Sequence, residues 1–292
     1  MKFHNRIHVS LSSTLSRSIV FRRLFRTKAG RFVLTLPGAI AYLFTNKNSF
    51  IPPPHRTFCG RGDYTGIGRH FFNIFKSNVE LRPGHKVLDI GCGMGRMAVP
   101  FTSFLKPEGE YHGFDIVPEG ITWCRERIQK HHSNFVFRHV DVYNELYNKK
   151  GTIKPEELNF PYRDDYFDFI FLTSVFTHMS PPAIQRYLDE IHRVLKLDGH
   201  VIISMYLLNE ESSGNIRDGK SRLLFKYPRD GIHLSIDPKL VDDDIAIEEN
   251  WFRQNVRDRK FFEMKKIYYG TWSGRKGGLS TQDIVVIRKP AP

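Results

Sequence analysis

The segment VLDIGCGMGR, residues 87–96, decides the fold of this chain. An apolar run ends in Asp89 and opens into Gly91, Gly93 and Gly95, as a buried strand does where it turns towards a helix. Such turns receive nucleotide-containing ligands, because glycine lets the backbone approach the ligand closely. The segment therefore predicts an α/β fold with a ligand site at the end of its first strand.

The glycine spacing argues against two common nucleotide sites. A dinucleotide fingerprint reads GxGxxG, and Arg96 stands where its last glycine is required. The GxxxxGK[ST] pattern of a phosphate-binding loop is absent from the sequence. Asp115 follows Gly95 by twenty positions and closes the next strand, where a carboxylate binds ribose hydroxyls. An adenosine-containing ligand is therefore expected. Sites for nicotinamide cofactors and for S-adenosylmethionine both have this carboxylate, so its presence does not distinguish the two cofactors.

Short apolar runs alternate with amphipathic segments along the body of the chain. This alternation predicts a mostly parallel sheet with helices on both faces. Apolar spacing in residues 63–81 predicts a helix that leads into the sheet. The expected strands are 86–90, 111–115, 135–140, 168–173 and 200–206, and the expected helices are 94–105, 118–131 and 181–195.

Two polar stretches and a hairpin complete the body. Residues 143–166 follow the third strand and residues 207–250 follow the fifth, so both can reach the carboxyl edge of the sheet where ligands bind. Residues 261–270 and 282–289 are two apolar runs joined by a glycine-rich loop. They predict a terminal hairpin, which brings an antiparallel strand to one side of the sheet.

The net charge of +13 is concentrated in the N-terminal part of the chain. Residues 1–62 hold eleven Lys or Arg and no Asp or Glu, and the remaining residues hold 33 basic against 31 acidic side chains. The stretch IPPPHR, residues 51–56, is a stiff break. We therefore divide the chain into a basic extension, 1–56, and an α/β domain, 57–292.

A basic tail on a nearly neutral body favours an anionic membrane surface, an organelle address or a solvated arm. The apolar segment of residues 32–44 has thirteen residues, too few to cross a bilayer core of roughly 30 Å. Residues 17–47 are expected to make any peripheral membrane contact. The expected location is cytoplasmic and peripheral to the membrane, or mitochondrial if the source is eukaryotic, because the extension is rich in Arg and Ser and free of acids.

The three cysteines, Cys59, Cys92 and Cys124, form no CxxC pair and have no histidine cluster at metal-ligand spacing. Neither a disulfide framework nor a zinc site is indicated, and we expect no bound metal. A reducing compartment fits this cysteine usage.

Five motifs in order resemble the class I S-adenosylmethionine-dependent methyltransferases. They are VLDIGCGMGR, GFDI, HVDVYN, DFIFLTSVFTHM and RVLKLDGHVIISM, and the resemblance extends over about residues 60–290. Within the class the chain looks most like bacterial methyltransferases of small molecules, lipids or glycans, and its ending, GTWSGR followed by QDIVVIRK, belongs to that likeness. The resemblance implies a seven-stranded Rossmann-like sheet, six strands parallel and the seventh antiparallel, and S-adenosylmethionine as cofactor.

The charges of S-adenosylmethionine suggest how the glycine loop would receive it. Asp89 can pair with the ammonium of the methionine end, directly or through water. The amides after Gly91, through Gly93 and Gly95, and a helix beginning near Met94 suit the carboxylate. The resemblance implies the remaining roles: Asp115 for the ribose hydroxyls, Ile116 packed on adenine, Asp141 for the adenine amino group, Val142 through its amide, and Thr173 beside the methionine end.

His178 is the candidate general base, because it follows the fourth strand and an unperturbed imidazole titrates near pH 6.5. The alternative is a histidine at a helix start that is bonded to backbone. Arg275 in the hairpin loop can hold an anionic acceptor or stand in a plain turn. Tyr64 and Arg69 can close over the methionine end or belong to an ordinary amphipathic helix.

The expected function is transfer of a methyl group to a small-molecule, lipid or glycan acceptor. The alternatives are an RNA or protein methyltransferase that uses the basic tail as a binding arm, and a module that has lost turnover. Enzymes that methylate amino groups of nucleic-acid bases carry Asn-Pro-Pro-Tyr or Asp-Pro-Pro-Tyr after the fourth strand. The chain has only Ser-Pro-Pro there, at residues 180–182, so nucleic acid is not the expected partner.

Overall fold

The computed structural model describes residues 50–53, 55–58, 62–240, 243–258 and 262–291. The chain divides into two units, Met1–Gly62 and Asp63–Pro292, and the elements described below belong to the second. The expected membrane-contact segment, residues 17–47, lies outside the described residues, so its role stays a prediction. Within the described ranges, no helix has the length and apolar character needed to cross a membrane.

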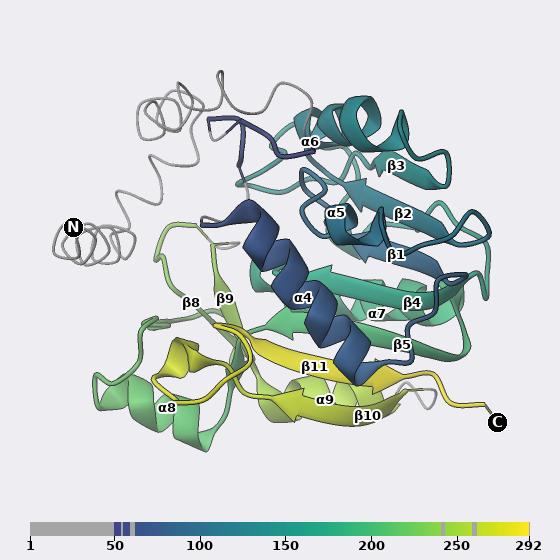
Figure 1. Ribbon diagram of the computed structural model, residues 1–292. Helices are drawn as coiled ribbons and strands as arrows, with labels where there is room; N and C mark the ends of the chain where they lie inside the picture. The colour runs from purple at the N-terminus through teal and green to yellow at the C-terminus, as the bar shows by residue number, and fades with distance from the viewer. Residues whose placement is uncertain (1–49, 54, 59–61, 241–242, 259–261, 292) are drawn as a thin grey trace, which may run out of the picture. The chain divides into compact units, whose positions relative to one another are not determined.

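A seven-stranded sheet forms the centre of the second unit, in the order β10-β11-β5-β4-β1-β2-β3 (Figure 1). Strands β1 to β5 pair in parallel, and β11 lies antiparallel between β5 and β10. Six strands therefore share one direction and the seventh opposes them, as predicted. The strands are β1 (Lys86–Ile90), β2 (Glu110–Asp115), β3 (Phe135–His139), β4 (Phe167–Thr173), β5 (Leu195–Met205), β10 (Glu263–Tyr268) and β11 (Asp283–Arg288).

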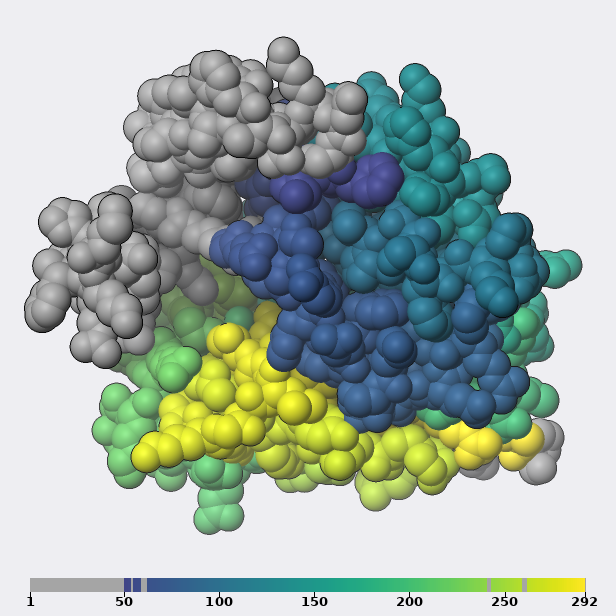
Figure 2. All heavy atoms as spheres, viewed as in Figure 1, coloured from purple at the N-terminus to yellow at the C-terminus, as the bar shows by residue number. Residues whose placement is uncertain are grey.

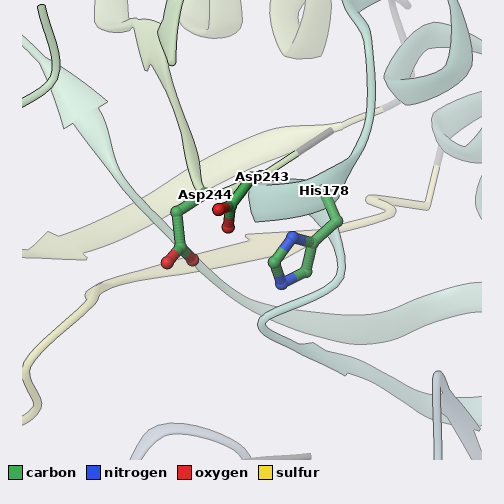
Figure 3. A group of neighbouring side chains, drawn as sticks. All are labelled: His178, Asp243 and Asp244. Atoms are coloured by element: carbon green, nitrogen blue, oxygen red, sulfur yellow. The ribbon is translucent and has the colours of Figure 1, made fainter. Parts of the chain in front are cut away.

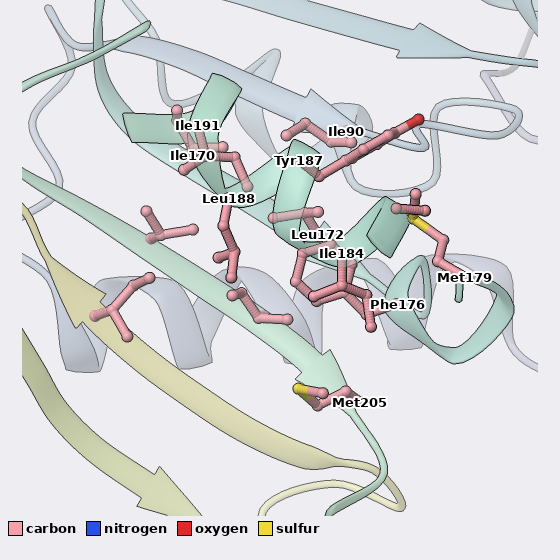
Figure 4. Packing of buried hydrophobic residues seen from close by; sticks show 14 of the residues in the cluster. Ile90, Ile170, Leu172, Phe176, Met179, Ile184, Tyr187, Leu188, Ile191 and Met205 are labelled. Atoms are coloured by element: carbon pink, nitrogen blue, oxygen red, sulfur yellow. The ribbon is translucent and has the colours of Figure 1, made fainter. Parts of the chain in front are cut away.

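The alternation of side chains along β1 and β4 separates two layers of core. Leu88 and Ile90 of β1, with Ile170 and Leu172 of β4, belong to one buried cluster, which α7 (Pro181–Val194) covers (Figure 4). Helix α7 has proline at its first position, where no helical N–H is needed, and presents apolar residues at a spacing of three to four. Helix α9 (Glu249–Asp258) contributes to the same cluster.

Aromatic side chains fill the opposite face of the sheet. Phe75 of α4 (Tyr64–Asn78) packs on Phe171 with ring centres 4.5 Å apart, and Phe101 of α5 (Ala98–Phe101) stacks on the same ring at 6.0 Å. In the space-filling view α4 lies beside the terminal hairpin (Figure 2). The hydroxyl of Tyr268, in the hairpin, donates a hydrogen bond of 2.7 Å to the side chain of Asn78 at the end of α4. The predicted lead helix is confirmed and is fixed on the sheet.

The helix expected over residues 94–105 is wrong. Only α5, four residues long, forms there, and turns flank it. Pro100 has no N–H to donate to the preceding turn, and Gly95 has a φ of +81°, which is outside the helical region. The helix expected over 118–131 is confirmed as α6 (Pro118–Cys124), continued by a π-helical turn, η1 (Arg125–Gln129).

Residues 207–250 form a second sheet that the sequence pattern does not reveal. Its strand order is β6-β9-β8-β7. The strands are β6 (Leu207–Leu208), β7 (Tyr227–Pro228), β8 (His233–Ser235) and β9 (Ile245–Glu248), with α8 (Glu210–Arg217) after β6. Short 3-10 turns complete the unit: η2 (Pro155–Glu157), η3 (Phe176–His178) and η4 (Thr271–Ser273). Because β9 packs against η3, the second sheet reaches the carboxyl edge of the large one.

Candidate active site

The loop after β1 needs glycine because its backbone has positive φ angles and because neighbouring side chains leave no room for a Cβ atom at two of its glycines. Gly91, Gly93 and Gly95 have φ angles of +75°, +54° and +81°. A Cβ on Gly91 would lie 2.4 Å from a methyl group of Val175, and one on Gly95 would lie 2.6 Å from Ile128. The loop therefore forms a tight arch in which two of the three positions cannot carry a side chain without displacing a neighbour.

Several backbone N–H groups of the arch donate hydrogen bonds within the protein. The N–H groups of Gly91 and Cys92 both donate to the carbonyl of Phe114, at 2.9 and 3.0 Å, and that of Gly95 donates to Cys92 at 2.9 Å. The Gly93 N–H donates to Asp115. These amides were expected to bind a carboxylate, together with a helix beginning near Met94. The expected helix start is wrong, because α5 begins only at Ala98 and has a single turn. Binding of the carboxylate by the glycine loop stays a prediction.

Asp89 lies at the floor of the site with no exposed surface. The Tyr111 hydroxyl donates to its Oδ2 at 2.6 Å, while Oδ1 is buried without a hydrogen-bond partner among the described residues. Burial raises the pKa of Asp89 to about 8; the Tyr111 hydrogen bond opposes that shift and the charge of Asp115 adds to it. A buried acceptor with one oxygen unused fits a cationic donor such as an ammonium group.

Asp115 joins the arch to the loop after β2. Its Oδ2 accepts the Gly93 N–H at 2.7 Å and its Oδ1 accepts the Val117 N–H at 2.8 Å. Burial raises the pKa of Asp115, and these amide hydrogen bonds partly offset the rise. Each carboxylate oxygen can accept another hydrogen bond, so the group retains acceptors for two hydroxyls. Ile116 follows it and is half-buried against the core, and its contact with adenine stays a prediction.

Asp141 and Val142 come after β3, which ends at His139. The Asp141 carboxylate accepts hydrogen bonds from the Thr152 hydroxyl at 2.7 Å, the Thr152 amide at 3.2 Å and the Asn148 side chain at 3.3 Å. The hydrogen bonds from Thr152 and Asn148 lower the pKa of Asp141. Residues of the insertion 143–166 thus fix the position of the Asp141 carboxylate. The adenine roles of Asp141 and Val142 stay predictions.

The ends of β4 and β5 carry a polar chain that sequence reasoning missed. Ser204 donates to Gln282 at 2.6 Å, and Gln282 donates to Ser174 at 2.7 Å. Ser174 has a φ of +62°, so the chain turns sharply directly after Thr173, which pairs in register with Ser204. The only sequence signal was that each residue stands at the end of an apolar run. The methionine-end role of Thr173 stays a prediction.

The structure brings His178 together with two acidic residues from the second sheet region (Figure 3). One ligand atom each of His178, Asp243 and Asp244 lies within 4.8 Å of the others. Asp243 is 1% exposed and Asp244 9%, and His178 is half-buried at the end of η3. Sequence reasoning selected His178 but not its neighbours, because 65 residues separate His178 from Asp243 and no spacing rule connects them.

Arg275 and Tyr64, two further candidate site residues, form contacts within the protein. Arg275 lies over the Tyr269 ring at 4.3 Å, forms an ion pair with Glu211 at 2.8 Å and donates to Asn209 at 2.8 Å. The Tyr64 hydroxyl donates to the carbonyl of Met94 at 2.8 Å, so it ties α4 to the arch.

The second sheet also borders a pocket of about 640 Å³ beside the beginnings of α8 and α9, with Asn209, His233, Glu249 and Tyr269 among its lining residues. This volume is within the range of small-molecule sites.

The carboxyl edge therefore has a glycine arch, two buried carboxylates behind it and a polar strand end beside it. A family model described as "Methyltransferase domain" matches residues 81–226, which is half of the chain. The chain belongs to this methyltransferase family. The expected class I fold and the S-adenosylmethionine cofactor are thereby confirmed, and the orphaned Oδ1 of Asp89 fits the ammonium of that cofactor.

Named relatives cover only parts of this methyltransferase. Sterol 24-C-methyltransferase of Schizosaccharomyces pombe is 25% identical over 161 residues, 55% of this chain and 38% of the relative. A ubiquinone/menaquinone biosynthesis C-methyltransferase of Cupriavidus pinatubonensis is 30% identical over 136 residues, 45% of this chain and 46% of the relative. The chain thus spans less than half the length of these two relatives.

A solved structure supports the fold. The PH0226 protein of Pyrococcus horikoshii superposes with a TM-score of 0.54 at 18% identity, covering 82% of this chain and 96% of that one. At this identity the likeness concerns the arrangement of strands and helices only.

Binding of S-adenosylmethionine should release a proton from Asp89. With a pKa of about 8, the free carboxyl is mostly protonated near neutral pH, and an ammonium beside it favours the ionised form. We expect release of about one proton per site at roughly pH 6–7, fading as the pH rises through 8. Calorimetry in buffers of different ionisation enthalpy measures this number. Asp89→Asn should abolish the release, and a wild-type enthalpy independent of buffer would contradict the role.

Proposed function

We propose that this chain is an active methyltransferase that uses S-adenosylmethionine to methylate a small-molecule or lipid acceptor. The observation that carries the proposal is the pairing of the glycine arch with Asp115, whose two oxygens fix both loops and keep acceptors for a ribose. The presence of Asp89, Asp115 and the glycine arch favours an active enzyme over the alternative of a module that has lost turnover.

The protein's part in the reaction is positioning. The cofactor supplies a methyl group that its sulfonium already activates. Buried Asp89 would hold the ammonium of the cofactor and Asp115 its ribose, and the acceptor would approach from the loop after β4, which carries Ser174 and His178. Fixing two reactants in line is worth roughly 7–11 kcal/mol of a reaction barrier, so a preformed cradle can account for much of the rate.

The acceptor class rests on two supports. The named relatives act on sterols and quinone precursors according to their names, which favours a small or lipid-like acceptor. The segment most able to select an acceptor is residues 207–250, because it forms its own sheet against the carboxyl edge through β9 and η3. The sequence also allowed a glycan acceptor, and neither relative's name supports that class.

Two measurements test the proposal. Calorimetric titration of the full chain with S-adenosylmethionine, its demethylated product and NAD should give binding of the first two and none of NAD. Incubation with methyl-labelled S-adenosylmethionine and fractionated extract should then place label in the lipid or small-molecule fraction. Label confined to RNA or protein would favour the alternative acceptor class, and cofactor binding without labelled product in any fraction would contradict the proposed activity.

A further inference from the structure

We propose that His178, Asp243 and Asp244 form a binding site for a divalent metal ion of the Mn²⁺ class. The three side chains each offer one ligand atom, and these atoms all lie within 4.8 Å of one another. Figure 3 shows the two carboxylates and the imidazole facing a shared space. No sequence motif marks this set, because its members come from separate segments that only the fold joins.

The donor set selects the kind of ion. Two carboxylates and one imidazole give a mixed oxygen and nitrogen site, which suits Mn²⁺, Fe²⁺ or Zn²⁺ better than Ca²⁺, since Ca²⁺ takes oxygen ligands almost alone. Ligand atoms at about 2.1 Å from an ion stand roughly 3–4 Å apart. The three ligand atoms lie within 4.8 Å of one another, so an ion would draw them closer by rotation of the side chains.

The backbone and the surroundings support the same assembly. Asp244 has a φ of +34°, which turns the chain so that the consecutive carboxylates of Asp243 and Asp244 can face one space instead of opposite sides of a strand. Asn144 donates to the carbonyl of His178 at 3.4 Å, and the Tyr147 ring packs edge-on to the imidazole at 5.3 Å. Two neighbouring carboxylates in low dielectric attract a cation strongly.

The position of the three ligands in the fold suggests a role for the bound ion. His178 ends η3, three residues after the loop that carries Ser174, so an ion here would stand at the carboxyl edge of β4. Three protein ligands leave coordination positions for water or for an acceptor oxygen. This role rests on the proposed function, whereas metal binding does not. It points to an acceptor that presents a hydroxyl or phenolic oxygen to the ion.

The test is to titrate Mn²⁺ into the full chain. Binding is measured as the loss of the electron paramagnetic resonance signal of the free ion. We expect one bound Mn²⁺ per chain, with nitrogen modulation from a coordinated imidazole in pulsed spectra. His178→Ala and Asp243→Asn should each weaken binding at least about tenfold, since even changes outside the ligand set cost 10- to 100-fold. Asp164→Asn is the matched control, because the Asp164 side chain is 71% exposed and pairs only with Arg193 among the described residues.

Three outcomes would overturn the site. They are a wild-type protein that leaves the Mn²⁺ signal unchanged, a bound ion without histidine nitrogen coupling, and variants that bind as well as the wild type. The nitrogen coupling is read on the wild type, so the test survives a variant that fails to fold. S-adenosylmethionine titration of the same samples separates the two proposals, because lost cofactor binding counts against the methyltransferase function and leaves the metal result standing.

Discussion

Replacing Asp115 by alanine should weaken S-adenosylmethionine binding by about 10- to 100-fold. The change removes the acceptor that we propose for the ribose hydroxyls, and hydrogen bonds to charged groups contribute about 1.5–3 kcal/mol each. It also leaves the Gly93 and Val117 amides without their acceptor, so the arch loses the contact that fixes Gly93. Calorimetric titration measures the affinity directly.

The conservative Asp115→Asn variant separates the two contributions. Asparagine keeps one carbonyl oxygen at the same place, so it should retain one of the two amide contacts and bind with intermediate affinity. Asp164→Ala is the control for a general effect of removing a carboxylate, because that side chain is 71% exposed. Unchanged affinity in Asp115→Ala would show that the ribose is held elsewhere.

Replacing Asp283 by alanine should lower the free energy of unfolding by about 3–5 kcal/mol. This carboxylate is fully buried and accepts three hydrogen bonds: from the Gly270 amide at 2.6 Å, the Leu207 amide at 2.7 Å and the Trp272 indole at 2.8 Å. Each buried donor left without an acceptor costs about 1–3 kcal/mol. Urea denaturation of the full chain measures the loss.

Asp283→Asn tests whether the acceptor oxygens account for the loss. Its single carbonyl can serve the Leu207 and Trp272 donors, while its NH₂ group would oppose the Gly270 amide, so the loss should be smaller than in the alanine variant. Asp164→Ala should unfold like the wild type within a few tenths of a kcal/mol. A loss below about 1 kcal/mol in Asp283→Ala would mean that the three donors find other partners.

The large sheet was predictable because its strands are long apolar runs. Strand β4 has seven residues and β1 has five, each almost wholly buried, and their order follows from the alternation with helices. Asp115 was predictable for a related reason. The register of β1 against β2 aligns Asp89 with Gly113, which sets the ends of the two strands side by side.

The second sheet was not predictable from pattern. Its strands have two to four residues, too few for a period of two to stand out, and Pro228 and the polar residues around it suggest only turns. The helix at α5 was predicted too long, because apolar spacing alone favours a helix over residues 94–105 and takes no account of the missing N–H of Pro100.

The site was predictable where its partners belong to motifs at the ends of neighbouring strands, and unpredictable where segments without a motif meet. Gly93 lies in the loop after β1 and Asp115 ends β2, so the two meet at the carboxyl ends of neighbouring parallel strands. Asp243 reaches His178 only through the packing of β9 on η3, a contact between two short elements. The hydrogen bond from Tyr64 to Met94 depends likewise on how α4 lies on the arch.

The position of β11 has a consequence for synthesis of the protein. Residues 283–288 form an inner strand, inserted between β5 and β10, although both neighbours precede them in the sequence. The ribosome therefore synthesises β5 and β10 before β11, the strand with which both of them pair. Until β11 is made, the edge of β5 that will bind it stays unpaired. We expect the nascent chain to complete its sheet only after residue 288 has emerged, so that a chaperone bound to the open edge would protect it until then.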